Sequence, residues 1–215
     1  MEIKVVRQIL EWNENCHEEL QKLLNSKKVL MINVMGSPGG GKTTFIMQLI
    51  KMMREKYRFG VIEGDIAGKI DAEKIASMGI PVVQLNTEGA CHIEAMSIKN
   101  ILPEFNLDQI DILIVENIGN LVCPAEFDIG EHLKVALLSI PEGDDKVEKY
   151  PLMFKRADAV ILSKYDMKQF FDFDEDRVIS NAKKINEDVK IFKVNSSKGD
   201  GIKDIADWIE KYIVK

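Results

Sequence analysis

A glycine-rich loop that ends in a lysine and two threonines carries the strongest chemical signal in the sequence. Residues 36–44 are Gly-Ser-Pro-Gly-Gly-Gly-Lys-Thr-Thr, which matches G-x-x-x-x-G-K-S/T between a strand-like apolar run and a helical pattern. Backbone N–H groups in such a loop, with the N-terminus of the following helix, bind phosphate oxygens. We expect Lys42 to reach the β- and γ-phosphates and the Thr43 hydroxyl to bind Mg²⁺. The predicted nucleotide-binding residues of this loop are Gly36, Ser37, Gly39, Gly40, Gly41, Lys42, Thr43 and Thr44.

Two acidic side chains end strand-like segments and complete the expected phosphate chemistry. Glu116 closes residues 110–116 and is a candidate Mg²⁺ partner, and Asp65 closes residues 59–65. Asp65 could bind Mg²⁺, hold a metal-bound water or orient the attacking water, and the sequence does not choose among these roles. Lys42, Asp65 and Glu116 are therefore the catalytic candidates, and Thr43, Asp65 and Glu116 the magnesium candidates. The N–H of Gly119 is expected to meet the γ-phosphate, in the layout of a switch segment.

The segment 163–166, Ser-Lys-Tyr-Asp, indicates recognition of a guanine base. It follows a strand pattern, where GTP-binding proteins carry Asn-Lys-x-Asp. Asp166 would accept hydrogen bonds from guanine N1 and N2, and the Lys164 stem would pack across the base. Ser163 stands in place of the asparagine, a departure that weakens the signal. A loop after the last strand resembles the Ser-Ala-Lys loop on the other side of guanine, and its residues are Ser196, Ser197 and Lys198. Both segments favour GTP over ATP.

Two thiols and an imidazole form a second candidate site. Cys91 and His92 are expected at the start of a helix, and Cys123 follows Gly119 by four residues and precedes a proline. This ligand set suits Zn²⁺ or Ni²⁺, although structural cysteines are the alternative. A ligand at position 123 would move when the switch gains or loses its γ-phosphate contact. Three ligands do not close a tetrahedral site, so a second copy of the chain or a water could complete it.

A further Cys-His pair, Cys16 and His17, lies on an amphipathic pattern near the N-terminus. Cys16 belongs to the apolar stripe of this pattern, and buried free cysteine is common. We therefore expect Cys16 in the core and His17 in solvent, rather than a metal site.

The composition indicates a soluble globular protein. The 215 residues carry a net charge of −6, which argues against nucleic acid as the main partner, because phosphate neutralisation needs a basic face. No apolar run approaches the length of a membrane span, and the first residues do not resemble a signal peptide. Three cysteines are too few and too odd in number for a disulfide framework, so we expect a cytoplasmic, reducing setting.

Apolar strand patterns alternate with helical patterns, which indicates a mainly parallel sheet with helices on both faces. The expected strands are residues 29–35, 59–65, 80–85, 110–116, 133–139, 159–163 and 189–194. The expected helices are residues 3–25, a helix after the phosphate loop, and residues 70–78, 93–102, 174–186 and 202 onward. We predict one three-layer α/β domain of the P-loop NTPase type over residues 1–215, with residues 1–27 as an N-terminal helical extension.

The motifs together resemble the HypB family, the nickel-incorporation GTPases of [NiFe]-hydrogenase maturation. The resemblance rests on residues 36–44, 63–65, 91–92, 116–124, 150–154 and 163–166 and on the terminal Gly-x-Gly loop. It implies a GTPase of the signal-recognition-particle and MinD-like class that forms a homodimer with nucleotide. Its metal ligands would be Cys91, His92 and Cys123, near the dimer interface. Lys146 and Lys149 are candidates for a lysine that contacts the partner's phosphates.

The resemblance also implies a function and partners. GTP with Mg²⁺ would order the switch and favour the dimer, and hydrolysis would change the affinity for Ni²⁺ or Zn²⁺. The implied partners are a zinc-containing companion nickel chaperone and the [NiFe]-hydrogenase large-subunit precursor. Three alternatives stay open: a urease-accessory nickel GTPase, an ATP-dependent small-molecule kinase with structural cysteines, and a metal-binding protein that nucleotide merely stabilises. The choice between Ni²⁺ and Zn²⁺ is also open.

Overall fold

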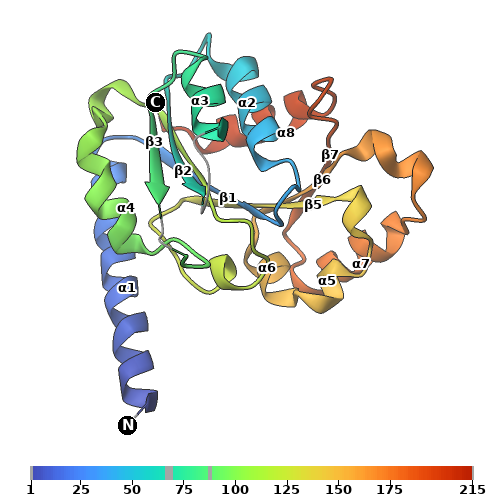
Figure 1. Cartoon of the computed structure of the whole chain (residues 1–215), viewed down its shortest axis with the longest axis horizontal. Helices are drawn as coiled ribbons and strands as arrows, with labels where there is room; N and C mark the ends of the chain where they lie inside the picture. Colours follow the sequence, from blue (N-terminus) through green and yellow to red (C-terminus); the bar gives the residue numbers. More distant parts are fainter. Residues whose placement is uncertain (1, 66–69, 87–88, 215) are drawn as a thin grey trace.

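In the part of the chain that the structure describes, a seven-stranded sheet forms the centre, and all its strands run parallel (Figure 1). The computed structural model describes residues 2–65, 70–86 and 89–214; the side chains of residues 2–11 and 65 lie outside the described part. The strand order is β3-β2-β4-β1-β5-β6-β7, which places β1 between β4 and β5. The strands are β1 (Leu30–Gly36), β2 (Phe59–Asp65), β3 (Val82–Asn86), β4 (Ile112–Glu116), β5 (Leu133–Ser139), β6 (Ala159–Ser163) and β7 (Lys190–Lys193).

Helices cover both faces of this sheet, as the apolar strand patterns predict (Figure 1). One face carries α2, α3 and α8; the other carries α1 and α4 at one end and α5, α6 and α7 at the other. None of the helices in the described residues has the length and apolar character that crossing a membrane requires. The α-helices are α1 (Glu2–Ser26), α2 (Lys42–Met53), α3 (Ile70–Ala76), α4 (Ala95–Ile101), α5 (Lys146–Lys149), α6 (Pro151–Arg156), α7 (Glu175–Ile185) and α8 (Ile202–Ile209). Short 3₁₀ helices lie at Leu102–Glu104, Leu107–Gln109, Cys123–Ala125, Ile140–Glu142, Tyr165–Phe170 and Glu210–Tyr212.

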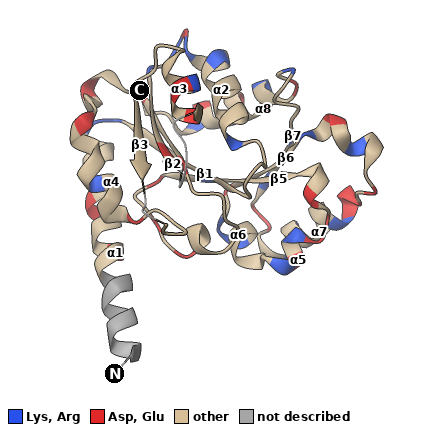
Figure 2. Ribbon diagram, viewed as in Figure 1, with Lys and Arg blue, Asp and Glu red and all other residues tan. Residues whose placement is uncertain are grey.

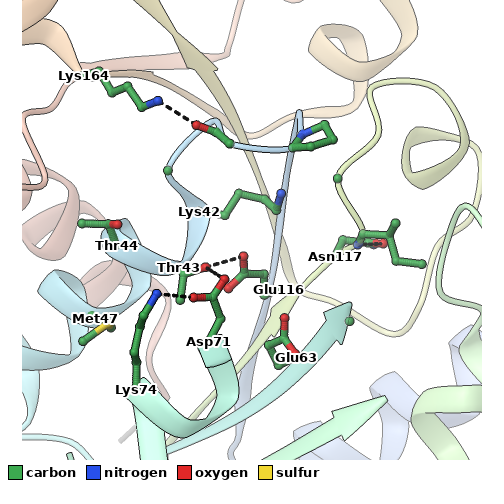
Figure 3. Close-up of a pocket in the computed structure, with 16 residues that line it drawn as sticks. Lys42, Thr43, Thr44, Met47, Glu63, Asp71, Lys74, Glu116, Asn117 and Lys164 are labelled. Atoms are coloured by element: carbon green, nitrogen blue, oxygen red, sulfur yellow. Dashed lines mark hydrogen bonds and ion pairs between the residues drawn. The ribbon is translucent and has the colours of Figure 1, made fainter. Parts of the chain in front are cut away.

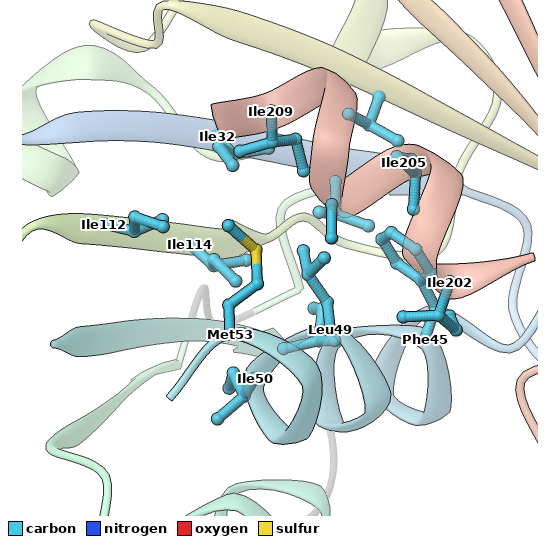
Figure 4. Close-up of a cluster of buried hydrophobic side chains, with 14 of the residues drawn as sticks. Ile32, Phe45, Leu49, Ile50, Met53, Ile112, Ile114, Ile202, Ile205 and Ile209 are labelled. Atoms are coloured by element: carbon cyan, nitrogen blue, oxygen red, sulfur yellow. The ribbon is translucent and has the colours of Figure 1, made fainter. Parts of the chain in front are cut away.

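The central strand β1 contributes to the core on both sides of the sheet. Ile32 and Val34 pack in the cluster beneath α2 and α8, whereas Met31 packs with α1 and α4 and Met35 packs with α6. Successive side chains of a strand point to opposite faces, so a strand covered on both sides is apolar throughout. Figure 4 shows the first of these clusters, where α2 and α8 meet over the sheet through Phe45, Leu49, Met53, Ile202, Ile205 and Ile209.

The C-terminal half of α1 belongs to the core and packs against α4 (Figure 1). Cys16 is 4% exposed and lies in the same cluster as Leu20, which confirms the predicted core position. The prediction that His17 is solvated holds only in part: its side chain is 18% exposed, and its Nδ1 accepts a 2.9 Å hydrogen bond from the backbone N–H of Gly130. The two residues are 113 positions apart. Helical periodicity reports which face of α1 is apolar, but it does not report a polar contact with a distant loop.

The predicted strands all agree with the structure to within two residues, whereas two helices were not predicted. The missed helices, α5 and α6, have 4 and 6 residues, too few to display a helical period. The helix predicted over residues 93–102 begins at Ala95. Cys91 and His92 therefore lie in the loop before α4, and not at its first turn as predicted.

Charged side chains of both signs are mixed over α5 and α7 and join these helices (Figure 2). Arg177 of α7 donates through Nε to Glu148 of α5 at 3.0 Å and through Nη1 to Asp144 at 2.9 Å. The Asp174 carboxylate caps α7 by accepting from the backbone N–H of Arg177 at 2.9 Å. These contacts attach the start of α7 to α5 and to the loop that precedes α5.

Glu175, at the start of α7, holds the 3₁₀ helix Tyr165–Phe170 against β7. Its carboxylate accepts hydrogen bonds from Tyr165 Oη and Lys168 Nζ, each at 2.5 Å, and pairs with Lys193 of β7. Burial opposes ionisation of Glu175, but these three bonds outweigh it and lower its pKa from the ordinary 4.5 to about 2. The segment held in this way carries Asp166, so the ion cluster supports the candidate base-binding residues.

Replacing Glu175 with glutamine should lower stability at neutral pH but not at low pH. A carboxyl whose pKa is depressed by folding stabilises the protein above its unfolded pKa and loses that effect as the pH falls towards the folded value. We expect Glu175→Gln to lower the free energy of unfolding by about 1–3 kcal/mol at pH 7. The difference from the parent should shrink between pH 4.5 and 2. Denaturant unfolding at a series of pH values measures it, with exposed Glu104→Gln as the control. A deficit that does not change with pH would contradict the assignment.

Candidate functional site

The phosphate-binding loop joins the end of β1 to the start of α2, as the sequence predicts. Gly41 precedes α2 with a φ of 96°, a left-handed conformation that glycine adopts without steric cost. The Lys42 side chain is buried and turns back over the loop, where Nζ donates to the carbonyls of Gly36 at 3.4 Å and Ser37 at 3.2 Å. The loop therefore surrounds a concentrated positive charge at the N-terminus of a helix, which is the arrangement that binds phosphate.

A cavity of about 580 Å³ opens beside this loop (Figure 3). Its volume is in the range of small-molecule sites. The phosphate loop, β2, α3 and the segment after β4 all contribute to its wall. The residues that line it are Pro38, Gly39, Gly41, Lys42, Thr43, Thr44, Met47, Glu63, Gly64, Asp71, Lys74, Glu116, Asn117, Ile118, Gly119 and Lys164.

Thr43 lies among carboxylates in this cavity (Figure 3). Its hydroxyl is 2.9 Å from Glu116 Oε1 and 3.3 Å from Asp71 Oδ2. Glu63 pairs in register with Glu116 across β2 and β4, and both are buried. A hydroxyl and several carboxylates at one point are the oxygen ligands that Mg²⁺ takes beside phosphates, so the donor set fits this ion. The side chain of Asp65, the other predicted magnesium candidate, lies outside the described residues.

Sequence reasoning did not identify Asp71, and it named Glu63 only within the segment 63–65, without a role at the site. Asp71 lies in the first turn of α3, and its Oδ1 also accepts a 2.6 Å hydrogen bond from Lys74. In the sequence it has the appearance of an ordinary acidic residue near a helix start. Glu63 stands two positions before the end of β2, and its place opposite Glu116 depends on the pairing of β2 with β4. The order of the strands brings Glu63 beside Glu116, and the position of α3 brings Asp71 to Thr43.

Gly119 packs directly against the phosphate loop. A Cβ at this position would lie 2.8 Å from both Cγ and N of Pro38, which is too close for any side chain. Gly119 also lines the large cavity. The predicted switch glycine is therefore in contact with the loop that would hold the phosphates.

Ser163 and Lys164 hold the phosphate loop from the other side. The buried Ser163 hydroxyl donates to the carbonyl of Gly40 at 2.6 Å, and Lys164 Nζ donates to the carbonyl of Gly39 at 2.7 Å. A serine at position 163 therefore links the base-binding segment to the phosphate loop by a direct hydrogen bond. This contact gives the departure from asparagine a structural role.

A second cavity, of about 230 Å³, lies next to this link, on the side of the predicted base. Ser163, Asp166, Ser196 and Ser197 line it, together with Gly41, Thr44, Lys164, Met167 and Asn195. Of the predicted base-binding residues, Lys198 does not line this cavity; it is exposed on the loop beyond it. The buried Ser196 side chain was predicted only by analogy with the Ser-Ala-Lys loop, and here it faces the same space as Asp166.

Cys91, His92 and Cys123 come together as the only group of this kind that the described residues contain. One ligand atom from each lies within 4.8 Å of the others. Cys91 Sγ is 3.6 Å from His92 Nδ1 and 2.9 Å from Cys123 Sγ. A tetrahedral ion with the usual bond lengths needs about 3.6 Å between sulfur and nitrogen and about 3.8 Å between two sulfurs. The histidine separation fits as it stands, and the thiols must open by about 1 Å.

Proton competition should affect this metal site. The hydrogen bond to Cys123, burial and the charge of that second thiol raise the pKa of the Cys91 thiol. Because metal binds the thiolate, the proton must leave when metal enters. Metal affinity at the cluster is therefore expected to fall as the solution becomes more acidic.

Two side chains that the sequence did not identify orient the His92 ring. Phe127 stacks on it with centroids 4.0 Å apart and ring planes 15° apart. The Nε2 atom of His92 is 3.6 Å from Glu94 Oε1, which leaves Nδ1 towards the thiols. A carboxylate behind a ligating histidine is a frequent arrangement at metal sites. Phe127 and Glu94 gave no signal because nothing in their spacing relates them to position 92.

A chain of buried polar side chains runs from the switch to the loop that carries Phe127. Asn117 donates to Asn33 at 3.1 Å, and Asn33 donates to Glu131 Oε1 at 3.3 Å. The other Glu131 oxygen accepts from the backbone N–H of Ile129 at 2.7 Å. Asn33, Asn117 and Glu131 are 0%, 1% and 4% exposed, so their mutual hydrogen bonds are needed to offset burial.

Lys146 and Lys149, the predicted trans lysines, lie on α5 and not in the large cavity of the described chain. Both ammonium groups pair with Asp145, Lys146 at 3.3 Å. Lys149 is 58% exposed, so it is the more accessible of the two. Their role towards a second copy of the chain stays a prediction.

The sequence has relatives of known family. A family model described as CobW/HypB/UreG, nucleotide-binding domain, matches residues 30–193. The "Probable hydrogenase maturation factor HypB" of Methanocaldococcus jannaschii is 36% identical over 98% of this chain and 96% of its own length. The "Hydrogenase/urease maturation factor HypB" of Helicobacter hepaticus is 40% identical over 97% of this chain and 87% of its own length.

Solved structures show the same fold. The crystal structure of HypB from Helicobacter pylori in complex with nickel has a TM-score of 0.87 and 36% identity, and covers 94% of this chain and 98% of that one. The signal recognition particle receptor FtsY of Elizabethkingia anophelis has a TM-score of 0.59 over 99% of this chain and 80% of its own, at 16% identity. The second similarity concerns the fold alone. Both similarities confirm the predicted architecture, a parallel α/β sheet of the P-loop NTPase type.

Removing the Ser163 hydroxyl should weaken nucleotide binding. In Ser163→Ala the carbonyl of Gly40 loses its buried donor, so the phosphate loop is less well fixed against the base-binding segment. We expect nucleotide affinity to fall about two- to tenfold, as the loss of one hydrogen bond implies. Titration with a fluorescent guanine nucleotide measures this. Ser26→Ala is the matched control, because Ser26 also donates to a backbone carbonyl but lies at the end of α1. Equal affinities for all three proteins would refute the proposed link.

Removing one thiol of the cluster should abolish tight metal binding. Cys123→Ala leaves two ligands, and we expect the dissociation constant for Ni²⁺ or Zn²⁺ to rise at least about tenfold. Cys16→Ala removes the third thiol of the chain, which lies in the core, and should leave metal affinity unchanged. Competition with a chromophoric chelator gives both constants. If the two variants lost affinity alike, the cluster would not be the binding site.

Proposed function

The chain belongs to the CobW/HypB/UreG family, among the HypB hydrogenase maturation factors, and on this premise we propose that it is a GTP-hydrolysing nickel chaperone. The observation that carries the proposal is the continuity of residues 116–123. This segment begins at Glu116 in the nucleotide cavity, passes Gly119 at the phosphate loop and ends at Cys123 in the thiol–imidazole cluster. One short stretch of backbone therefore belongs to both sites.

The geometry supports nucleoside triphosphate hydrolysis. Lys42 and the N–H groups of the glycine loop would bind the β- and γ-phosphates, and the N–H of Gly119 would sense the γ-phosphate. Mg²⁺, held at Thr43 and the neighbouring carboxylates, would offset the charge that develops on the separating phosphate oxygens. Glu116 anchors the Thr43 hydroxyl at 2.9 Å and keeps this group in place. Asp65 remains our proposal for the residue that holds or orients the attacking water.

The base-side cavity supports GTP as the substrate. Asp166 lines it, and a carboxylate there accepts from guanine N1 and N2 but has no donor for adenine N1. Ser196 and Ser197 line the same cavity. An ATP-dependent kinase would need a different arrangement at Asp166, so we favour GTP.

Ni²⁺ or Zn²⁺ is the cargo of the cluster, and not a resident structural ion. Three ligands leave a tetrahedral ion with one open position, and Cys91 is exposed. A second copy of the chain could close that position, which would make metal binding and dimerisation support each other. In this homodimer Lys146 or Lys149 would reach the partner's phosphates.

We further propose that the chain works in the cytoplasm with a zinc-containing companion nickel chaperone and the [NiFe]-hydrogenase large-subunit precursor. The hydrogenase maturation factors among its relatives support this choice of acceptor. The name of the Helicobacter hepaticus relative includes urease, so a urease apoprotein is a second candidate acceptor. We propose no membrane partner and no nucleic-acid partner.

Nucleotide state should change both metal affinity and assembly. We expect Ni²⁺ to bind about fivefold or more tightly with a non-hydrolysable GTP analogue than with GDP, because the γ-phosphate contact at Gly119 positions Cys123. The analogue should also favour the homodimer. Chelator competition and sedimentation velocity, run on the same samples with Mg²⁺ present, measure the two effects.

Two controls make this experiment decisive. ATP should not displace a labelled guanine nucleotide, and equal displacement would contradict the assignment of GTP. Zn²⁺ titrated in parallel distinguishes a general response of the cluster from one confined to Ni²⁺. If Ni²⁺ affinity is the same in both nucleotide states, the protein would be a GTPase whose metal cluster works independently.

A further inference from the structure

Asn120 contacts the phosphate loop and both halves of the metal cluster. Its backbone N–H donates to the carbonyl of Gly36 at 3.2 Å, and the two residues form an isolated antiparallel bridge. Its side-chain amide donates to the carbonyl of Cys91 at 3.3 Å. Its side-chain oxygen accepts from the N–H of Val122 at 2.9 Å. Asn120 is therefore hydrogen-bonded to the loops that carry all three candidate metal ligands.

The backbone hydrogen bond to Gly36 ties the position of Asn120 to that of the phosphate loop. The carbonyl of Gly36 accepts from both the Asn120 N–H and Lys42 Nζ. If a bound phosphate draws the Lys42 ammonium group away, the Asn120 N–H would remain as the donor to this carbonyl. Gly119, the preceding residue, packs on Pro38 of the same loop. Asn120 thus follows movements of the phosphate loop through two adjacent contacts.

The two side-chain hydrogen bonds of Asn120 connect it to the loops that carry the candidate metal ligands. The turn closed by Asn120 and Val122 leads directly into Cys123, and the bond to Cys91 joins that turn to the other thiol loop. A shift of Asn120 changes the separation between the two thiol-bearing loops. The two Sγ atoms are 2.9 Å apart and must separate by about 1 Å for a tetrahedral ion to fit.

We propose that Asn120 is a positioning residue that converts nucleotide state into the separation of Cys91 and Cys123. The inference rests on the proposed function and adds the group that joins its two sites. The competing interpretation is that Asn120 only closes a local turn, as asparagine side chains often do. A local role predicts a loss of stability, whereas a positioning role predicts a loss of the nucleotide effect on metal binding.

The test compares Ni²⁺ affinity with GDP and with the GTP analogue in three variants. Asn120→Ala removes both side-chain bonds. Asn120→Asp keeps the oxygen that accepts from Val122 but loses the amide that donates to Cys91. Asn106→Ala is the matched control, because Asn106 closes a similar turn by accepting from Asp108 at 3.2 Å, away from both sites. The intensity of the Ni²⁺–thiolate charge-transfer absorption is a second, spectroscopic readout of ligand geometry.

In Asn120→Ala and Asn120→Asp we expect the ratio of the two dissociation constants to fall about two- to tenfold, to near unity. The charge-transfer spectrum should then no longer depend on nucleotide, while guanine nucleotide affinity persists. Asn106→Ala should keep the parent ratio. Parent-like ratios in both Asn120 variants would overturn the assignment while leaving the proposed function intact. A ratio of one in the parent itself would overturn the proposed coupling and this assignment together.

Discussion

The parallel pairing of β1 with β4 is the constraint on which both candidate sites depend. Val34 pairs with Glu116, and beyond the strand the N–H of Asn117 donates to the carbonyl of Val34 at 2.9 Å. The chain after β4 therefore continues alongside the phosphate loop, where Asn120 bonds to Gly36. Because β1 lies between β4 and β5, both strands that flank it are buried, and the register is fixed by apolar packing on two faces. A slip of this pair would separate Glu116 from Thr43 and Cys123 from Cys91 at once.

A chain of buried polar side chains runs through the same region, and breaking only some of its hydrogen bonds would cost free energy. Asn33, Asn117 and Glu131 are almost fully buried, and each depends on the others for hydrogen bonds. Such a network favours two discrete arrangements over intermediate ones, because a half-broken network leaves buried polar atoms unsatisfied. It also fixes the loop that carries Phe127, whose ring stacks on His92. Phe127 thereby orients the His92 ring from the loop before β5. Cys123, in contrast, lies at the end of the switch segment itself.

Sequence patterns were sufficient for the features that local spacing specifies. The glycine loop, the strand ends and the Cys91, His92 and Cys123 set could all be identified, because one strand period or one motif contains each signal. Asp71 and Phe127 could not, since each gains its place from packing between segments distant in sequence. Glu94 is only two positions from His92, but the conformation of the loop before α4 decides that it lies beside the ring. The same limit explains His17, whose partner Gly130 lies 113 positions away. The four-residue spacing of Gly119 and Cys123 predicted a link between the two sites, and the geometry supplies the residues between them.

The open candidate metal cluster and the short segment that joins it to the phosphate loop would suit metal transfer better than metal storage. A closed set of four ligands holds an ion by leaving no position for an incoming ligand, whereas three ligands with an exposed thiol admit a competitor. Cys123 lies only four residues beyond Gly119, so a short segment joins the glycine that packs on the phosphate loop to the candidate metal ligand. In the proposed coupling, a connection of this length would pass a displacement at the phosphate loop on to the thiol. With metal–sulfur distances tolerant to about 0.2 Å, a shift of that order is enough to change which ligands an ion keeps.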